Sequence, residues 1–370
     1  MTAITTHKIG SDVAKVASAL LGRQTTPPCG AEAIAMLAGR RVLVTGAAGS
    51  IGSELVRQVH AAGAHVFLLD VDESRLHAVM LDISGSGLLD DDRVVLADIR
   101  DARRVRRVFA DVKPDIVFHA AAQKHLPLLE RYPCEGVKTN VIGTDLVLDA
   151  AVAAGVERFI LVSTDKAADP TSVLGATKRL AECLVGSVPA GATKCASVRF
   201  GNVLGSRGSF LETLAHQINE GLPVTVTDPE VTRYFMTIPE AVGLVIEAAA
   251  MADHGEIYVL DMGEPVRIID LVERYVTLAG ADEPDVRFTG LRPGEKLHEA
   301  LFGLGEDHRA TAHPRISRTA RVDAPRRLAD LVDQLDMLAR MEDDRRVMEL
   351  LGAVMPSVTQ PGTVAVAQAA

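Results

Sequence analysis

A short run of hydroxyl, carboxylate and amine side chains follows an apolar stretch near the middle of the chain. The run is Ser163-Thr164-Asp165-Lys166, and a second lysine, Lys178, comes twelve residues after Lys166. A carboxyl group and an amine that lie side by side can give and take protons in a reaction. On the residues alone, a surface ion pair at the end of a strand is the simpler explanation of Asp165 and Lys166.

A glycine-rich turn is the second candidate for chemistry. The segment TGAAGSIG, residues 45–52, spaces Gly46, Gly49 and Gly52 three apart between an apolar run and a helical pattern. Such glycines permit a tight turn and a close backbone approach to a pyrophosphate, which then lies at the helix N-terminus. An ordinary strand-to-helix turn is the alternative. We expect a dinucleotide to be bound by Gly46, Gly49, Ser50, Ile51, Gly52, Asp70, Asp98, Ala120 and Lys178.

Two acidic residues at the ends of apolar runs bear on the choice of cofactor. Asp70 is placed to hold the adenosine ribose hydroxyls and to repel a 2′-phosphate, which favours NAD over NADP. Asp98 is a candidate for the adenine amino group, although a helix cap before Asp101–Val112 would also explain it. A helix that begins near Ser172 would direct Lys178 toward the nicotinamide ribose.

Apolar runs alternate with helical patterns from Arg41 onward. The runs are Arg41–Thr45, His65–Asp70, Arg93–Ala97, Asp115–His119, Arg158–Ser163 and Cys195–Phe200. The helical patterns are Ser50–Ala62, Ala102–Val112, Val141–Ala154 and Gly175–Leu184. Continuous apolar strands separated by helices predict an α/β fold, a doubly wound parallel sheet of the Rossmann type.

The alternation weakens after Phe200, which predicts a smaller C-terminal substrate-binding cap over the carboxyl ends of the strands. The sequence divides into an N-terminal extension (1–36, with a helix at Asp12–Leu21), an NAD-binding Rossmann domain (37–202), a region that is mostly cap (203–323, with 239–262 returning to the Rossmann core), and C-terminal helices with a disordered tail (324–370).

Composition restricts the class of protein. The 370 residues are 48% hydrophobic and 24% charged with a net charge of −10, which argues against nonspecific nucleic-acid binding. No apolar run reaches the ~18 to 20 residues of a membrane span, and the N-terminus lacks a signal-peptide pattern. We therefore expect a cytoplasmic protein without a membrane partner. The cysteines lack metal-site spacing, so no metal is expected; they are Cys29, Cys134, Cys183 and Cys195.

Several longer motifs add a resemblance to these local patterns. They are HAAAQKHLPLLE (119–130), KTNVIGT (138–144), STDKAADPTSVLGATKR (163–179), RFGNVLGSRGS (199–209), TDPEVTRYFMTIPEA (227–241) and GLRPGEKLHE (290–299). With the glycine turn, they resemble the UDP-N-acetylglucosamine 4,6-dehydratase family of polysaccharide biosynthesis, which belongs to the extended short-chain dehydrogenases. The resemblance runs from about Leu37 to the C-terminal helices. The chain looks like a free-standing form of the large membrane-anchored members, without their transmembrane part, and self-association into a homo-oligomer is expected.

The resemblance implies a reaction and the residues that perform it. Hydride leaves C4 of a UDP-hexose for NAD, a base removes the C5 proton, an acid protonates the departing 6-hydroxyl, and the hydride returns to C6. By similarity, Asp165 is the acid and Lys166 is the base. A lysine base must be neutral, so we expect burial or nearby cations such as Lys124 or Lys178 to lower the pKa of Lys166.

One position departs from the short-chain dehydrogenase pattern. These enzymes carry a tyrosine four residues before the lysine as the proton carrier of hydride transfer, and here that position is Leu174. Leucine cannot transfer a proton. Thr164 and Asp165 are the nearest candidates to take the C4 hydroxyl proton, with the charge of Lys178 lowering their pKa.

Arginines within the motifs are candidates for the diphosphate of the substrate, because a guanidinium binds phosphate oxygens in pairs. Arg233 and Arg292 are the best placed, Arg199 and Arg207 also qualify, and Glu295 would hold the nucleoside ribose. Each of these residues would equally be explained as the anchor of a loop. The predicted substrate-binding set is Lys124, Asn202, Arg207, Arg233, Arg292 and Glu295.

Two other functions remain open on the sequence. An NDP-hexose epimerase or a 5,6-dehydratase would share the first oxidation and differ in the later steps. A catalytically silent sensor of NAD or sugar nucleotide is the alternative of another class. Leu174 alone favours the sensor, and the retention of Asp165, Lys166 and Lys178 argues against it.

Overall fold

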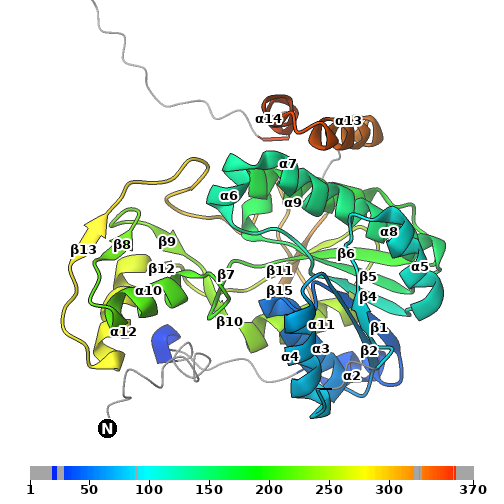
Figure 1. Cartoon of the computed structure of the whole chain (residues 1–370), viewed down its shortest axis with the longest axis horizontal. Coiled ribbons are helices and arrows are strands. Elements are labelled where there is room, and N and C mark those ends of the chain that lie inside the picture. Colours follow the sequence, from blue (N-terminus) through cyan, green and yellow to red (C-terminus); the bar gives the residue numbers. More distant parts are fainter. Residues whose placement is uncertain are drawn as a thin grey trace, which may run out of the picture.

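The structure, a computed structural model, describes residues 19–22, 29–87, 91–320, 325, 327–352 and 354–355. The predicted helix Asp12–Leu21 therefore lies mostly outside the described residues, and the predicted disordered end, 356–370, lies wholly outside them. The described chain forms a large α/β unit with a smaller lobe beside it (Figure 1).

Within the described residues, nine strands form the central sheet, in the order β14-β15-β11-β6-β5-β4-β1-β2-β3. Their bounds are β1 (Arg41–Thr45), β2 (His65–Asp70), β3 (Val94–Leu96), β4 (Ile116–His119), β5 (Arg158–Val162), β6 (Lys194–Arg199), β11 (Ile257–Leu260), β14 (Arg309–Ala310) and β15 (Ile316–Thr319). The strands from β3 across to β11 pair in parallel, whereas β15 is antiparallel to β11 and β14 to β15. The order 3-2-1-4-5-6 is that of a doubly wound Rossmann sheet, so the predicted fold class is confirmed.

Both faces of the sheet are buried, as the continuous apolar strands require. Successive side chains of a strand point to opposite faces, and in β1 Val42 and Val44 join one buried cluster while Leu43 joins the other. One face is covered by α2 (Ala31–Leu37), α3 (Ser50–Ala61), α4 (Glu73–Ser84) and α11 (Ile238–Met251). The opposite face is covered by α5 (Ala102–Val112), α8 (Thr144–Ala153), α9 (Val173–Ser187) and α13 (Leu328–Arg340).

Side-chain caps determine where several helices begin. Ser172 accepts a hydrogen bond from the Gly175 amide, so α9 begins at Val173, close to the start predicted near Ser172. Asp101 caps α5 by accepting from the Arg104 amide, so the alternative of Asp98 as that cap is wrong. The predicted helix Val141–Ala154 begins earlier, as the π-helical segment η2 (Val137–Gly143) that continues into α8.

The smaller lobe has its own apolar core around Leu214, Val226 and Tyr275. It contains α10 (Phe210–Asn219), α12 (Ile268–Ala279), and the strand pairs β8 (Val224–Val226) with β13 (Val286–Phe288) and β9 (Thr232–Arg233) with β12 (Val266–Arg267). A third pair, β7 (Asn202–Leu204) with β10 (Phe235–Thr237), connects the lobe to the large unit. The strands β14 and β15 lie in the large sheet, although the sequence suggested cap for that region.

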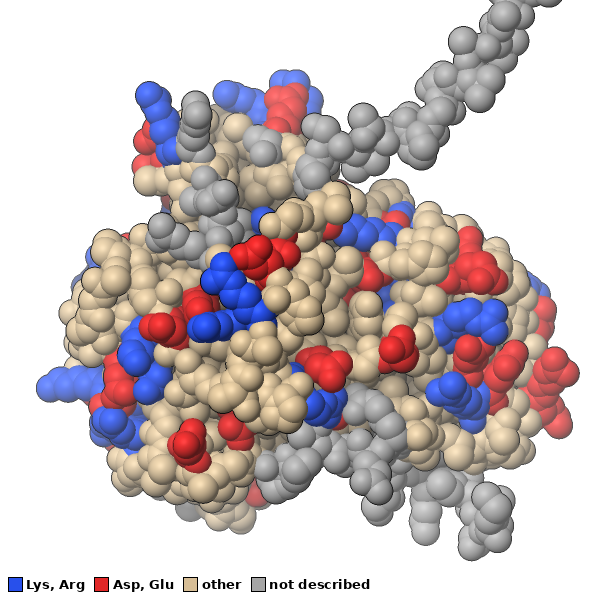
Figure 2. Space-filling view, turned by 180° about the vertical axis from the view of Figure 1, so that it is seen from behind, with Lys and Arg blue, Asp and Glu red and all other residues tan. Residues whose placement is uncertain are grey.

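The end of the chain packs back on the large unit. The short helices α6 (Leu126–Arg131) and α7 (Pro133–Gly136) follow β4, and α13 and α14 (Asp344–Gly352) lie against α7 and α9 (Figure 1). Figure 2 shows Lys and Arg side chains interspersed with Asp and Glu side chains over the rear face. Among the helices that the structure describes, none is both long enough and apolar enough to cross a bilayer.

Candidate active site

The glycine turn connects β1 to α3. It lies at the carboxyl end of β1, where the strand order of the sheet reverses. Gly46 has a φ of +68°, and a Cβ there would lie 2.6 Å from the Ala121 amide nitrogen. A Cβ on Gly52 would lie 2.0 Å from the Gly46 carbonyl oxygen. Any larger residue at either position would therefore displace the backbone. The turn places the N-terminus of α3 at the carboxyl ends of the strands, where backbone amides and the helix dipole favour an anion.

Asp70 holds this turn in place from the end of β2. Its Oδ2 accepts a hydrogen bond from the Ala48 amide at 2.9 Å, and its Oδ1 accepts from the Val71 and Asp72 amides at 2.8 and 3.1 Å. A carboxylate has about four acceptor positions, so capacity remains for a ribose hydroxyl. The Asp70 carboxylate therefore lies beside the glycine turn and can still accept hydrogen bonds.

The other predicted cofactor residues surround the same edge of the sheet. The Ala120 amide donates to the Thr45 carbonyl at 3.1 Å at the end of β4, beside the glycine turn. Ile51 lies in the first turn of α3 and packs against the apolar cluster beneath it. Asp98 follows β3 and forms a two-pronged ion pair with Arg100, with nitrogen–oxygen distances of 2.8 and 2.9 Å.

The carboxyl end of β5 carries Asp165 and Lys166 on the short 3₁₀ turn η3 (Asp165–Ala167). Thr164 caps this turn, and its hydroxyl donates to Asp165 Oδ1 at 2.9 Å. The same oxygen accepts from Lys166 Nζ at 3.0 Å. Asp165 is fully buried, and its Oδ2 has no hydrogen-bond partner in the described part of the chain.

Lys166 is surrounded by oxygen atoms from three segments. Besides Asp165, its Nζ lies 3.4 Å from Asn202 Oδ1 and 3.8 Å from Glu299 Oε1. Burial lowers the pKa of Lys166, but the charges of Asp165 and Glu299 raise it by more, and the net pKa is raised. The expectation of a lowered pKa at Lys166 is therefore wrong, because carboxylates and not lysines are the dominant charges around it.

Lys178 is the lysine whose pKa is lowered. Its Nζ is buried and donates to the Val162 carbonyl at the end of β5 at 2.6 Å. Burial lowers the pKa of Lys178 to about 8, partly opposed by the charge of Glu182. Leu174, one turn earlier on α9, is 7% exposed and belongs to the apolar cluster under the sheet.

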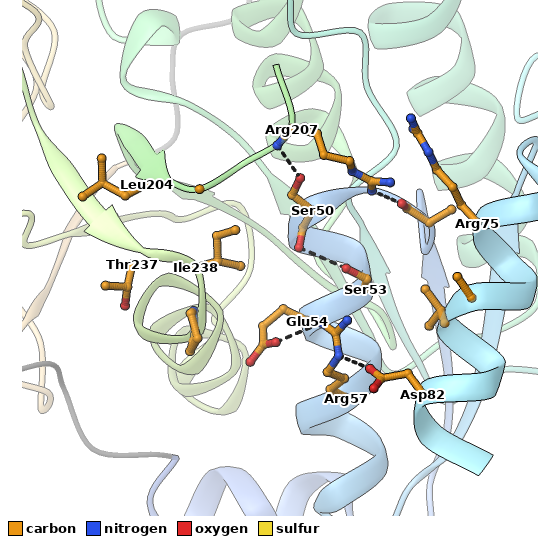
Figure 3. Close-up of a pocket in the computed structure, with 15 residues that line it drawn as sticks. Ser50, Ser53, Glu54, Arg57, Arg75, Asp82, Leu204, Arg207, Thr237 and Ile238 are labelled. Atoms are coloured by element: carbon orange, nitrogen blue, oxygen red, sulfur yellow. Dashed lines mark hydrogen bonds and ion pairs between the residues drawn. The ribbon is translucent and has the colours of Figure 1, made fainter. Parts of the chain in front are cut away.

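Arg207 and Lys124 meet at the glycine turn. The Arg207 amide donates to Ser50 Oγ at 3.1 Å, and its guanidinium donates to the Ala48 carbonyl (Figure 3). Lys124 Nζ donates to the Arg207 carbonyl at 2.6 Å, and burial lowers the pKa of Lys124. The structure thus places Arg207, predicted to bind substrate, directly on the predicted cofactor turn.

A cavity of about 550 Å³ flanks this turn (Figure 3). It lies between α3, α4 and the segments Leu204–Arg207 and Thr237–Pro239. Its wall includes Arg57, which pairs with Glu54 and Asp82. The cavity borders the glycine turn at Ala48 and Ser50, and its lining does not include the residues around Lys166.

The predicted diphosphate residues gather in the smaller lobe. Arg233 is 6% exposed and pairs with Glu295 at 2.8 Å, and it also donates to the Leu297 carbonyl. Glu295 accepts from the Arg292 amide at 3.2 Å, while the Arg292 side chain is exposed. Arg233, Arg292 and Glu295 therefore form one group, and Arg233 already shares its charge with a carboxylate.

Two features of the site were missed by sequence reasoning. Arg199 is fully buried between Glu182 at 2.7 Å and Glu306 at 2.6 Å, so it is not available to a diphosphate. Glu182 also accepts from Ser163 Oγ at 2.6 Å, which connects this pair to the segment Ser163–Lys166. The second feature is Glu299 beside Lys166. No local pattern identifies these partners, because they come from distant parts of the chain.

Curated relatives are similar to this chain over most of the chain's length. The probable polysaccharide biosynthesis protein EpsC of Bacillus subtilis is 45% identical over 82% of this chain and 52% of its own length. The capsular polysaccharide biosynthesis protein CapD of Staphylococcus aureus is 42% identical over 84% and 51%. The chain thus spans about half the length of these two relatives. A UDP-glucose 4-epimerase of Rickettsia rickettsii is 30% identical over 73% of this chain and 80% of its own length.

Solved structures share the fold of this chain. Pen from Bacillus thuringiensis has a TM-score of 0.69 at 31% identity over 77% of this chain and 89% of its own. A dTDP-glucose 4,6-dehydratase, DesIV of Streptomyces venezuelae, was solved with NAD bound; its TM-score is 0.62 at 26% identity over 71% and 88%. The model of the family described as polysaccharide biosynthesis protein matches residues 42–321. The chain belongs to that family, and its fold is that of the extended short-chain dehydrogenases.

Proposed function

We propose that the chain is an NAD-dependent dehydratase of a UDP-sugar, a UDP-N-acetylglucosamine 4,6-dehydratase. The observation that carries this proposal is the contact of Lys166 with Asp165 and Asn202 at the carboxyl end of β5. A 4,6-elimination needs an acid and a base beside the same hexose, and this contact supplies both chemical types. The family and its relatives in polysaccharide biosynthesis support a nucleotide-sugar substrate.

The glycine turn fits NAD, because Gly46 and Gly52 allow the close backbone packing that presents the amides at the α3 N-terminus as a cradle for a pyrophosphate. When bound, NAD would accept the C4 hydride and return it to C6. Asp70 would hold the adenosine ribose and disfavour a 2′-phosphate, and Asp98 is the candidate for the adenine. Gly49, Ser50, Ile51 and Ala120 would complete the cradle, and Lys178 would hold the nicotinamide ribose.

The chain's own residues would move the protons. Thr164 or Asp165 would take the C4 hydroxyl proton in place of the missing tyrosine. Lys166 would remove the C5 proton as a neutral amine, and Asp165 would deliver a proton to the departing 6-hydroxyl. A ketone at C4 makes the C5 proton acidic, so the order of steps follows from the chemistry of the sugar.

The smaller lobe would bind the UDP part. Arg233 and Arg292 would bind the diphosphate, with Arg233 exchanging part of its contact with Glu295 for phosphate oxygens. Glu295 would then accept from the ribose hydroxyls. Lys124 and Asn202 would line the sugar pocket, and Arg207, on the glycine turn, would lie between the two phosphate groups of substrate and cofactor.

The test is a reaction of purified protein and NAD with UDP-N-acetylglucosamine in heavy water, followed by mass spectrometry. The proposal predicts a product that has lost one water and gained solvent deuterium at C5. A sugar nucleotide recovered without loss of water would contradict it.

A UDP-hexose 4-epimerase is the second candidate, favoured by the Rickettsia rickettsii relative. An epimerase would invert C4 without water loss or C5 deuterium.

A further inference from the structure

Glu299 is a second carboxyl group near Lys166. It ends the motif GLRPGEKLHE, and the preceding residue, His298, bridges to Thr232 of β9. Glu299 Oε1 lies 3.8 Å from Lys166 Nζ, and Asp165 Oδ1 lies 3.0 Å from the same nitrogen. One ammonium group is therefore shared by two carboxyl groups from segments that are far apart in the chain.

The second oxygen of Glu299 is buried without a partner. The side chain is 3% exposed, and Oε2 has no hydrogen-bond partner among the described residues. An unsatisfied charged oxygen in such a place is costly, and a bound proton removes most of that cost. Asp165 Oδ2 is buried and unpartnered in the same way. The cluster thus has two carboxyl groups, one ammonium and unused acceptor sites for another proton.

The surrounding charges agree with a carboxyl group that holds a proton readily. Burial and the charge of Asp165 raise the pKa of Glu299, against the lowering effects of Lys166, Arg233 and Lys296, and the net pKa is raised. Arg233 is already paired with Glu295, which weakens its hold on Glu299. Two carboxyl groups beside a single ammonium do not ionise independently.

We propose that Glu299 accepts the ammonium proton of Lys166 and so frees the amine to remove the C5 proton. This inference rests on the proposed dehydration. An N–H bond of Lys166 breaks and an O–H bond on Glu299 forms, so the net charge of the buried cluster does not change. The two atoms must approach from 3.8 Å to hydrogen-bond distance, about 2.9 Å, which a small side-chain rotation achieves.

The remaining steps then balance. Lys166 takes the C5 proton, and the electron pair of that bond moves toward the C4 ketone. Asp165, which holds the proton of the C4 hydroxyl and lies 3.0 Å from Lys166, gives that proton to the 6-hydroxyl as the C6–O bond breaks and water leaves. When hydride returns to C6, the Lys166 ammonium, after exchange with solvent, protonates C5, and Glu299 then returns its proton to Lys166. Glu299 acts through Lys166 and is a positioning residue in this scheme.

The test compares pH profiles of turnover for the wild-type chain and Glu299→Gln, both with NAD and UDP-N-acetylglucosamine. Glutamine keeps the shape of the side chain but cannot accept a proton. Lys166 must then lose its proton to solvent, so turnover near pH 7 should fall by at least about tenfold. It should rise again as pH rises, roughly tenfold per unit on the acidic limb, because the Lys166 ammonium then loses its proton to solvent. Affinity for NAD should not change.

Two further variants make the outcome decisive. Glu299→Asp keeps a carboxyl group and should retain the shape of the wild-type profile at a lower rate, which also covers a glutamine variant that does not fold. Glu230→Gln, the same substitution at an exposed residue, should behave as wild type. A Glu299→Gln profile that is unchanged, or lowered equally at every pH, would overturn the inference. Absence of water loss in the wild-type chain would instead overturn the proposed function.

Discussion

The two lysines of the site are held in opposite electrostatic environments. Lys166 lies among carboxylates and its pKa is raised, whereas Lys178 is buried against a carbonyl and its pKa falls to about 8. Proximity to a strand end therefore does not determine the charge of a lysine; the neighbouring groups do. For Lys166 to act as a base, another group must first accept its proton. Glu299 is the neighbouring carboxyl group that can do so.

Lys178 should make stability depend on pH. Its pKa in the folded chain, about 8, lies below the ordinary value of 10.5, so the unfolded chain binds more protons between those values. Folding should therefore gain stability as pH rises from 8 toward 10, by an amount on the order of 2 kcal/mol relative to Lys178→Met. Chemical denaturation of both proteins without NAD, at pH 7, 8.5 and 10, measures this difference. A difference that is constant with pH would rule out the buried, weakly basic amine.

Contacts between helices, strands and loops assemble the site at the carboxyl ends of the strands. The glycine turn, η3 and β7 bring Gly46, Lys166 and Asn202 together there, because the parallel strands end on the same side of the sheet. The loop after Gly303 is fixed to β6 and α9 by Glu306, which pairs with Arg199 and Arg179 at 2.6 Å each. Through Arg199 and Glu182, these contacts connect the C-terminal part to the segment Ser163–Lys166.

Substitution Glu306→Gln should destabilise the fold near neutral pH. Burial raises the pKa of Glu306, but hydrogen bonds and charges from Arg199 and Arg179 lower it by more, to about 2. Without the Glu306 carboxylate, Arg199 and Arg179 share only the charge of Glu182, and the one positive charge left uncompensated in this buried group costs about 3 kcal/mol or more. The stabilisation from a lowered carboxyl pKa is present above the unfolded value and is lost as pH falls toward 2.

Urea denaturation at pH 7 and pH 3.5 measures this effect. The loss in the free energy of unfolding should be large at pH 7 and smaller at pH 3.5. Glu349→Gln, which removes an exposed pair with Arg345, is the matched control and should change stability by less than about 1 kcal/mol. An equal loss in the free energy of unfolding for the two variants at pH 7 would show that the buried pair stabilises the fold no more than the exposed pair does.

The glycine turn makes a sharper prediction. Gly52→Ala would place a Cβ 2.0 Å from the Gly46 carbonyl, so the turn should open and NAD affinity should fall by at least about a hundredfold. Calorimetric titration with NAD measures this loss. Gly352→Ala, at a position with open space around the added Cβ, should bind NAD as wild type does. Wild-type affinity in Gly52→Ala would mean that the dinucleotide does not use this turn.

At the scale of the whole molecule, the strands of the sheet were predicted better than the side-chain contacts at the carboxyl ends of those strands. Strands β1 and β2 match their predicted bounds because a parallel strand buried on both faces is a continuous apolar run. The edge strands β14 and β15 were missed, since they are short, partly polar and paired antiparallel. The π-helical turn η2 was missed because its register has no signature in residue type.

The same division applies to the site. Gly46, Asp70 and the pair Asp165–Lys166 are predictable, because each is fixed by its own strand and the next turn. Glu299 and the Arg199–Glu306 pair are not, because Glu306 is 107 residues from Arg199 and the folding of the lobe brings them together. The direction of the pKa shift at Lys166 depends on Asp165 together with the distant Glu299, so it could not be predicted from local patterns.

Solvent deuterium at C5 tests the central claim most directly. The wild-type chain, incubated in heavy water with NAD and UDP-N-acetylglucosamine, should yield a dehydrated product with deuterium at C5, while Lys166→Ala should bind NAD normally and yield neither. Lys194→Ala, which removes an exposed lysine at the start of β6, should react as wild type does. Unchanged deuterium incorporation and water loss in Lys166→Ala would contradict the assignment of the base.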